Sequence, residues 1–174
     1  DGSLPMAGAG RTPPRPPMPA GHRMADGPHR SVAGLAARPH AGPCMTDHLQ
    51  YRRNGPIVHL RLNRPAVHNA FNATLIETLT SALETAGKDP AVRLVVLEAD
   101  GPSFSAGADL NWMADMANAS EAENRGDALA LARLMRTLDE LPRPTIARVH
   151  GAAFGGGVGL VACCDIAIGV PEAK

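Results

Sequence analysis

The order of apolar and polar residues predicts several short strands along the second two thirds of the chain. Alternation over 57–62 is typical of a half-buried strand, and a turn sequence just before it predicts a hairpin between 47–53 and 57–62. A continuous apolar run at 94–97 predicts a strand that is covered on both faces. Short apolar runs at 145–149 and 166–168 predict two more strands.

Helical periodicity fills the intervals between these strands. Thr74 and Glu77 have the spacing of a capping box, and so do Ser120 and Glu123, so each pair predicts the start of a helix. The apolar segment 157–164 predicts another helix. The second helix is expected to turn four side chains inward, namely Leu131, Leu134, Met135 and Leu138. Strands that alternate with helices indicate an α/β fold with a largely parallel sheet.

Residues 1–44 differ from the rest in composition. They hold 9 of the 16 prolines and 7 of the 18 glycines, with five arginines and no lysine. No hydrophobic periodicity is present, so we expect a disordered extension over 1–44, followed by a domain over 45–174. Two interpretations of this extension stay open. One is translation from upstream of a start near Met45, and the other is an Arg-rich organellar transit peptide.

Charge and cysteine content exclude several classes of protein. The chain has 17 basic and 17 acidic residues, which argues against a nucleic-acid binder or a protein of anionic membrane surfaces. No apolar run is long enough to span a membrane. Three cysteines form neither a disulfide framework nor a zinc pair, and the histidines have no metal-ligand spacing, so no metal is expected. Reduced thiols fit a cytoplasmic location.

Two loops rich in small residues follow the predicted strands at 94–98 and 145–149. They are Phe104–Asp109 and Gly151–Gly159. Small residues leave backbone amides uncovered, and loops after neighbouring parallel strands can direct two N–H donors at one oxygen. Such an oxyanion hole suits a reaction that forms an enolate from a thioester carbonyl. For each loop alone, the alternative interpretation is a tight turn with close helix–strand packing.

The titratable residues near these loops have two interpretations each. Asp109 is either an acid of the site or a helix N-cap. His150 is either a structural residue at the end of a strand or a catalytic base. Cys163 and Cys164 lie in an apolar segment and are expected to be buried packing residues.

Four motifs stand in a characteristic order and spacing: Leu62-Asn63-Arg64-Pro65 with Asn69-Ala70-Phe71, then Phe104–Asp109, then Pro144–Ala147, then Gly151–Gly157 with Cys164-Asp165-Ile166. Together they resemble the crotonase (enoyl-CoA hydratase/isomerase) family. The resemblance covers about residues 47–174 and none of the extension.

This resemblance implies a crotonase-like spiral of ββα units, which assembles as a homotrimer or a hexamer. It implies an acyl-CoA thioester as ligand, with the thioester oxygen held by the backbone amides of Ala106 and Gly156. No separate cofactor is implied, because coenzyme A is part of the substrate. The implied substrate contacts are Gly107, Ala108 and Asp109 beside the oxyanion hole, and the backbone of Ala66, Val67 and His68 at the adenine end of CoA.

The segments 108–113 and 157–164 most resemble methylglutaconyl-CoA hydratases, which implies a role in branched-chain or isoprenoid acid catabolism. Family hydratases commonly carry one Glu where this chain has Gly159, and a second Glu at a position beyond Lys174. The leading interpretation is therefore an N-terminal fragment of an enoyl-CoA hydratase that is inactive as given. Two alternatives stay open: a non-catalytic CoA-binding or interaction module, and a crotonase-type isomerase with a differently placed acid.

Overall fold

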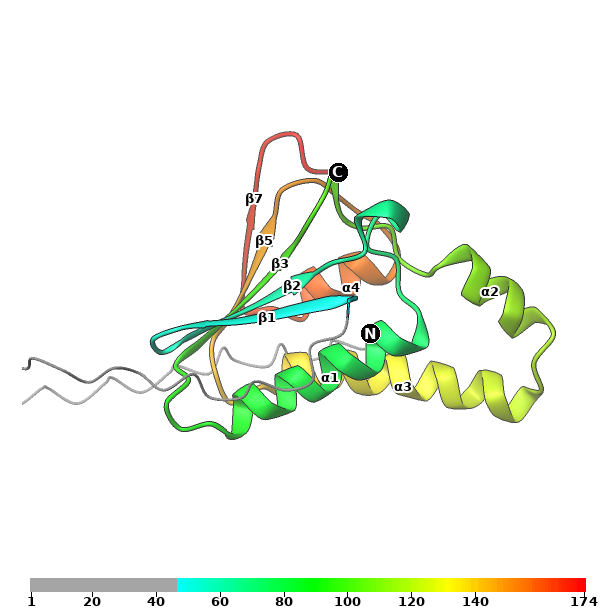
Figure 1. Ribbon diagram of the computed structural model, residues 1–174, viewed down its shortest axis with the longest axis horizontal. Coiled ribbons are helices and arrows are strands. Elements are labelled where there is room, and N and C mark those ends of the chain that lie inside the picture. Colours follow the sequence, from blue (N-terminus) through cyan, green and yellow to red (C-terminus); the bar gives the residue numbers. More distant parts are fainter. Residues whose placement is uncertain (1–46) are drawn as a thin grey trace, which may run out of the picture. The chain divides into compact units, whose positions relative to one another are not determined.

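A computed structural model describes residues 47–174, so the interpretation of residues 1–44 lies outside the described range. A five-stranded sheet with the order β1-β2-β3-β5-β7 forms the centre of the described part (Figure 1). Its first pair is the predicted antiparallel hairpin, and every other neighbouring pair is parallel. The strands are β1 (Leu49–Asn54), β2 (Ile57–Leu62), β3 (Leu94–Ala99), β5 (Thr145–Val149) and β7 (Ile166–Gly169).

Helices connect the parallel strands. They are α1 (Ala73–Lys88), α2 (Leu110–Ala117), α3 (Glu121–Asp139) and α4 (Gly156–Ala162), with a short 3-10 turn at Pro65–Val67. In Figure 1, α1 and α3 run side by side along one face of the sheet. The alternation of strands and helices predicted an α/β fold with a largely parallel sheet, and the structure confirms it.

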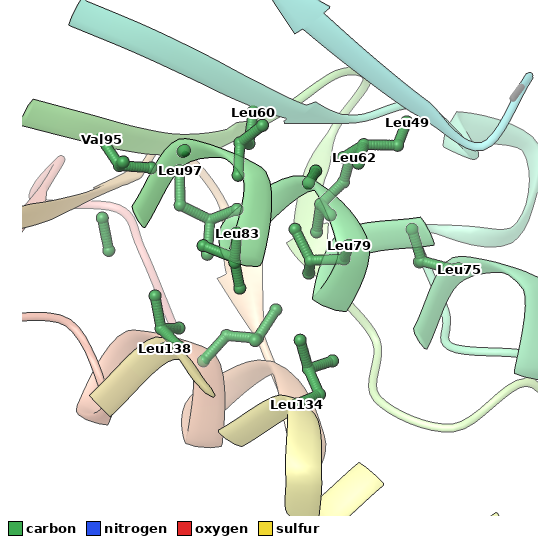
Figure 2. Packing of buried hydrophobic residues seen from close by; sticks show 14 of the residues in the cluster. Leu49, Leu60, Leu62, Leu75, Leu79, Leu83, Val95, Leu97, Leu134 and Leu138 are labelled. Atoms are coloured by element: carbon green, nitrogen blue, oxygen red, sulfur yellow. The ribbon is translucent and has the colours of Figure 1, made fainter. Parts of the chain in front are cut away.

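The hydrophobic core lies between this face of the sheet and the two long helices (Figure 2). Alternate residues of β2 point into it, because successive side chains of a strand face opposite sides. Helical spacing of three and four residues brings one face of α1 and one face of α3 against them. The fully buried leucines of the core include Leu60 and Leu62 from β2, Leu97 from β3, Leu79 and Leu83 from α1, and Leu134 and Leu138 from α3.

One of the two predicted helix starts is confirmed, and the other is wrong. Glu123 N–H donates to Ser120 Oγ, and the Glu123 carboxylate accepts from Ser120 N–H at 2.8 Å, so the second capping box is present. In α1, the side chain of Asn72 accepts from Leu75 N–H at 2.9 Å instead. The extended backbone of Asn72 lets its short amide reach that donor, so Asn72 replaces the predicted Thr74 as the cap.

A second, two-stranded sheet is the element that the pattern of residues did not predict. Its parallel strands are β4 (Ser103–Ser105) and β6 (Ala152–Ala153). Strand β4 follows β3 and strand β6 follows β5, and β3 and β5 are themselves parallel neighbours. The pairing of β4 with β6 therefore holds the two loops that leave these strands next to each other.

Candidate functional site

Asn69 organises the entry to the first loop. The residue is fully buried and has a left-handed backbone, with φ of 54°. Asparagine tolerates this conformation better than most residues. Its side-chain amide donates to the carbonyls of Asp100 and Ser103, at 2.7 and 2.9 Å. Its own carbonyl accepts from Ser105 Oγ at 2.9 Å, so Asn69 fixes both ends of the short strand β4.

The Ala106 N–H is already paired within the protein. It donates to the carbonyl of His68 at 2.9 Å. A donor in a good hydrogen bond of this length is not free for a ligand oxygen unless that bond breaks. The structure therefore does not offer Ala106 as an oxyanion donor, contrary to what the resemblance implies for this position.

Ala108 holds the free donor of this loop. It forms an isolated parallel bridge with Phe71, in which Phe71 N–H donates to Gly107 C=O at 2.6 Å and Asp109 N–H donates to Phe71 C=O at 2.9 Å. In such a bridge the flanking residues make the bonds, so the N–H of the central residue points to the other side. Within residues 47–174 the Ala108 N–H has no acceptor.

The second free donor lies at the start of α4. Gly155 precedes this helix with φ of 49°, a conformation that favours glycine. Gly157 N–H donates to Phe154 C=O at 2.8 Å and Val158 N–H donates to Gly155 C=O at 3.1 Å. The Gly156 N–H between them finds no acceptor in the described part of the chain, which agrees with the role that the resemblance implies for it.

The two loops touch through their backbones. A Cβ added at Gly107 would lie 3.0 Å from Phe154 C=O and 3.4 Å from the Gly156 nitrogen. Gly107 also has φ of 88°, so only glycine fits this crossing without strain. The Ala108 and Gly156 donors thus belong to adjoining segments. Two fixed backbone donors of this kind can stabilise negative charge that develops on one oxygen.

Asp109 is a helix cap, which is one of the two interpretations that the sequence left open. Its carboxylate accepts from Asn111 N–H at 3.0 Å and pairs with Arg64 Nη2 at 2.8 Å. Only 9% of its side chain is exposed. The hydrogen bond from Arg64 is the main reason that the pKa of this carboxyl lies below its usual value. Each of its two oxygens accepts a bond inside the protein, and direct contact with substrate stays a prediction.

The segment expected at the adenine end of CoA lies on the surface. Ala66, Val67 and His68 are all exposed. His68 has a left-handed backbone, and its Nδ1 lies 3.0 Å from Ser103 Oγ, beside the first loop. Among the described residues, neither the N–H nor the C=O of Ala66 has a partner. A free donor and a free acceptor on one exposed residue suit the edge of a purine base.

His150 and the two cysteines have structural surroundings. The Nε2 atom of His150 lies 2.7 Å from the carbonyl of Gly101, which supports the structural interpretation of this residue. Cys163 and Cys164 are half-buried against the core rather than fully buried as expected. Burial raises the pKa of Cys164 to about 11, which leaves very little thiolate at neutral pH and makes it a poor nucleophile.

Gly159 lies on α4, one turn beyond Gly156. A Cβ at this position would meet the end of the Met135 side chain, with 3.2 Å to Cε and 3.3 Å to Sδ. The position therefore faces α3 across a flexible side chain. The carboxylate of the first loop is Asp109, which is engaged with Arg64.

A cavity of about 390 Å³ lies between α1, α2 and α3, and sequence reasoning did not anticipate it. Glu77, Glu84 and Asp127 line it together with Arg133, which is paired with Glu84 at 2.7 Å. Three carboxylates against one paired cation do not suit the phosphates of CoA. The two donor loops therefore remain the candidate site.

Two further findings concern only residues 47–174. No group of three or more His, Cys, Asp or Glu side chains there is arranged to hold a metal ion. None of the helices in that range has the length and apolar character needed to cross a membrane.

Comparison with known proteins decides the family. The family model described as "Enoyl-CoA hydratase/isomerase" matches residues 52–174. The chain belongs to the enoyl-CoA hydratase/isomerase family. It is 38% identical over 116 residues to a crotonyl-CoA hydratase of Syntrophomonas wolfei, which covers 66% of this chain and 44% of that protein. It is 35% identical to the mitochondrial Delta(3,5)-Delta(2,4)-dienoyl-CoA isomerase of mouse, over 63% of this chain and 36% of that protein.

Solved structures of the family have the same fold. An enoyl-CoA hydratase from Shewanella pealeana superimposes with a TM-score of 0.68 and 44% identity, covering 70% of this chain and 46% of that chain. The crotonase-like fold implied by the four motifs is thus confirmed. The chain spans about half the length of the curated family members that it matches.

Proposed function

We propose that this chain binds the thioester carbonyl of an acyl-CoA and stabilises an enolate in enoyl-CoA hydration. The observation that carries the proposal is the pair of unpaired N–H groups at Ala108 and Gly156 in adjoining loops. Membership of the enoyl-CoA hydratase/isomerase family supports an acyl-CoA thioester as the ligand. No separate cofactor enters the proposal.

Enoyl-CoA hydration requires stabilisation of negative charge on the thioester oxygen. Water adds to the β-carbon of the enoyl group and gives up one proton to an acid/base group, and the electrons of the double bond move through the α-carbon onto the thioester oxygen. The resulting enolate accepts hydrogen bonds from the two backbone donors, and a proton then returns to the α-carbon. Loss of one donor of this kind typically costs about 10²- to 10³-fold in rate.

Proton transfer is the part for which the described residues offer no group. Gly159 has no side chain, and the Asp109 carboxylate is held by Arg64. The residues proposed here therefore bind and polarise the substrate, and the acid/base group is left unassigned. For this reason the non-catalytic CoA-binding module remains a second candidate for this chain. An isomerase uses the same enolate stabilisation, and the similarity to a mouse isomerase keeps that reaction type within the proposal.

The CoA end of the ligand would lie along the exposed turn at Ala66, Val67 and His68. The free N–H and C=O of Ala66 suit an adenine edge, and His68 joins this turn to the first loop through its carbonyl bond to Ala106. The acyl end would lie against exposed apolar side chains that flank the donors in sequence. These are Leu110, Met113, Phe154 and Val158.

The finer proposal for the acyl group is 3-methylglutaconyl, which rests on the resemblance of segments 108–113 and 157–164. Apolar neighbours fit its branched carbon chain. Its terminal carboxylate also needs a positively charged partner, and neither loop carries Lys or Arg. Competition between 3-methylglutaconyl-CoA and crotonyl-CoA for the chain tests this choice, since tighter binding of crotonyl-CoA would contradict it.

A matched pair of ligands tests the core of the proposal. Butyryl-CoA and S-butyl-CoA differ only at the carbon next to sulfur, which is C=O in the first and CH₂ in the second, and we define the ratio of their dissociation constants as the carbonyl preference. Two net hydrogen bonds of ordinary strength predict a preference of about 5- to 150-fold for butyryl-CoA. Equal binding of the two ligands would contradict an oxyanion hole. A crotonyl-CoA hydration assay on the same protein separates the catalytic proposal from the binding module.

A further inference from the structure

Arg64 joins the turn before α1 to the end of the first loop. Its Nη1 donates to the carbonyl of Ala70, and its Nη2 pairs with the Asp109 carboxylate at 2.8 Å. Its backbone N–H donates to the side-chain oxygen of Asn69 at 2.8 Å. The Arg64 side chain is only 13% exposed, so it does not reach out from the surface as a ligand-binding arginine would.

Asp109 directly follows Ala108, which carries the free N–H donor of the first loop. Its backbone N–H donates to Phe71 C=O, and its carboxylate is shared between the start of α2 and Arg64. The Ala108 N–H has no partner of its own within the described range. Its direction therefore depends on what fixes the residues on either side of Ala108.

Stability alone does not account for this ion pair. Replacing a whole buried ion pair by apolar side chains is often neutral for folding, because loss of hydration offsets the attraction, although removing one partner alone is destabilising. Its geometry, in contrast, is well defined, since the planar guanidinium bonds two separate segments at once. We propose that Arg64 is a positioning residue for the Ala108 donor, acting through Asp109. This inference rests on the proposed function, because it assumes that Ala108 contacts the thioester oxygen.

The test uses the carbonyl preference of the full chain, with stability recorded in parallel. Arg64→Gln removes the charge, and Asp109→Asn removes the ion pair while keeping an amide oxygen that can still cap α2. Each variant is expected to lower the carbonyl preference by about 3- to 10-fold, which is the effect of one misaligned hydrogen bond. The double variant is expected to lose no more than either single one. Affinity for CoA itself, which has no thioester oxygen, is expected to stay within about twofold.

The chain offers a matched control at the other end of α1. Arg53 also bonds one carboxylate and one backbone carbonyl, with 2.7 Å from Nη1 to Asp89 and 2.9 Å from Nε to Gly55 C=O. Arg53→Gln is expected to lower stability and leave the carbonyl preference at the wild-type value. If Arg64→Gln fails to fold, Asp109→Asn carries the test.

The outcomes separate the two proposals. A wild-type chain without carbonyl preference overturns the proposed function and this inference together. A wild-type preference that survives in Arg64→Gln or in Asp109→Asn overturns only the positioning role. An equal loss in Arg53→Gln also overturns it, since the effect would then follow stability rather than the place of the ion pair.

Discussion

The ring of Phe71 lies directly against Gly156. A Cβ at Gly156 would come within 2.5 Å of Phe71 Cε2 and 2.9 Å of Cδ2, closer than real side-chain atoms approach. The backbone of Phe71 is bonded on both sides of Ala108. One buried residue therefore contacts both donor segments, with its backbone against one loop and its ring against the other.

Gly156→Ala is expected to destabilise the fold. The added methyl group has no space unless the Phe71 ring moves, and overpacking of this kind costs about 1–3 kcal/mol. Denaturant titration measures the change. Adding Phe71→Leu is expected to recover part of the loss, since leucine lacks the ring atoms that the added methyl group would meet. Gly156→Ala with wild-type stability would show that the contact is not as tight as the structure indicates.

Asp109 gives a pH-dependent contribution to stability. Its pKa is lowered in the folded chain, chiefly by Arg64, so folding favours the ionised carboxylate. That contribution is fully present above the ordinary aspartate pKa of about 3.9 and is lost as pH falls through the lower folded value. Asp109→Asn is therefore expected to lose less stability than wild type between about pH 5 and about pH 3. Urea titrations across this interval measure the unfolding free energy of both proteins. An equal pH dependence of wild type and Asp109→Asn would contradict the prediction.

Glu98 is a buried acid on the face of the sheet opposite to Leu97. Its carboxylate accepts from Arg61 Nε at 3.1 Å and from Arg148 Nη1 at 2.7 Å, and 9% of its side chain is exposed. Glu98→Gln is expected to cost about 1–3 kcal/mol of unfolding free energy, because two charge-assisted bonds are weakened. The carbonyl preference is expected not to change. A loss of both stability and carbonyl preference would show that the bonds of Glu98 to its two arginines also affect the geometry of the site.

Gly159→Glu tests whether the chain lacks only its acid/base group. Residues three apart on a helix are neighbours, so a carboxylate at this position lies about one turn of α4 from the Gly156 donor. The Met135 side chain is flexible enough to make room for it. We expect hydration of crotonyl-CoA to rise by about 10²-fold or more over wild type, and Gly159→Gln to stay at the wild-type level. Equal rates for the two variants would mean that a carboxylate at this position does not transfer the proton.

Much of the fold followed from local patterns. Alternation in β2 and a turn sequence indicated the hairpin, a continuous apolar run indicated β3, and helical spacing with a capping box indicated α3. The strands β4 and β6, with three and two residues, are too short to have any periodicity. They exist because Asn69 and the crossing of the two loops hold them, and such contacts between distant residues leave no local signal.

The candidate site was predictable only in part. Glycine runs after parallel strands indicated free amides, and Gly156 does have one. Which amide of the first loop is free depends on the bridge between Phe71 and Ala108 and on the bond from Ala106 to His68. Both pair residues more than thirty positions apart in the sequence, so the residues alone left this choice open, and the Ala106 role came only from the family resemblance. The ion pair between Arg64 and Asp109 could not be predicted either, because these residues are also far apart in the sequence, although both stand in the recognised motifs.

Replacing single backbone amides by esters tests whether the Ala108 N–H binds the thioester oxygen. An ester at residue 108 exchanges the Ala108 N–H for oxygen and leaves the side chain unchanged, and the same exchange at residue 106 is the matched control. The measurement is the infrared carbonyl stretch of bound butyryl-CoA labelled with ¹³C at the thioester carbon, which falls when the oxygen accepts hydrogen bonds. We predict that the ester at 108 removes a large part of this shift, while the ester at 106 weakens the bond to His68, lowers stability and leaves the shift in place. A shift that survives at 108 and disappears at 106 would contradict the account and return the donor role to Ala106.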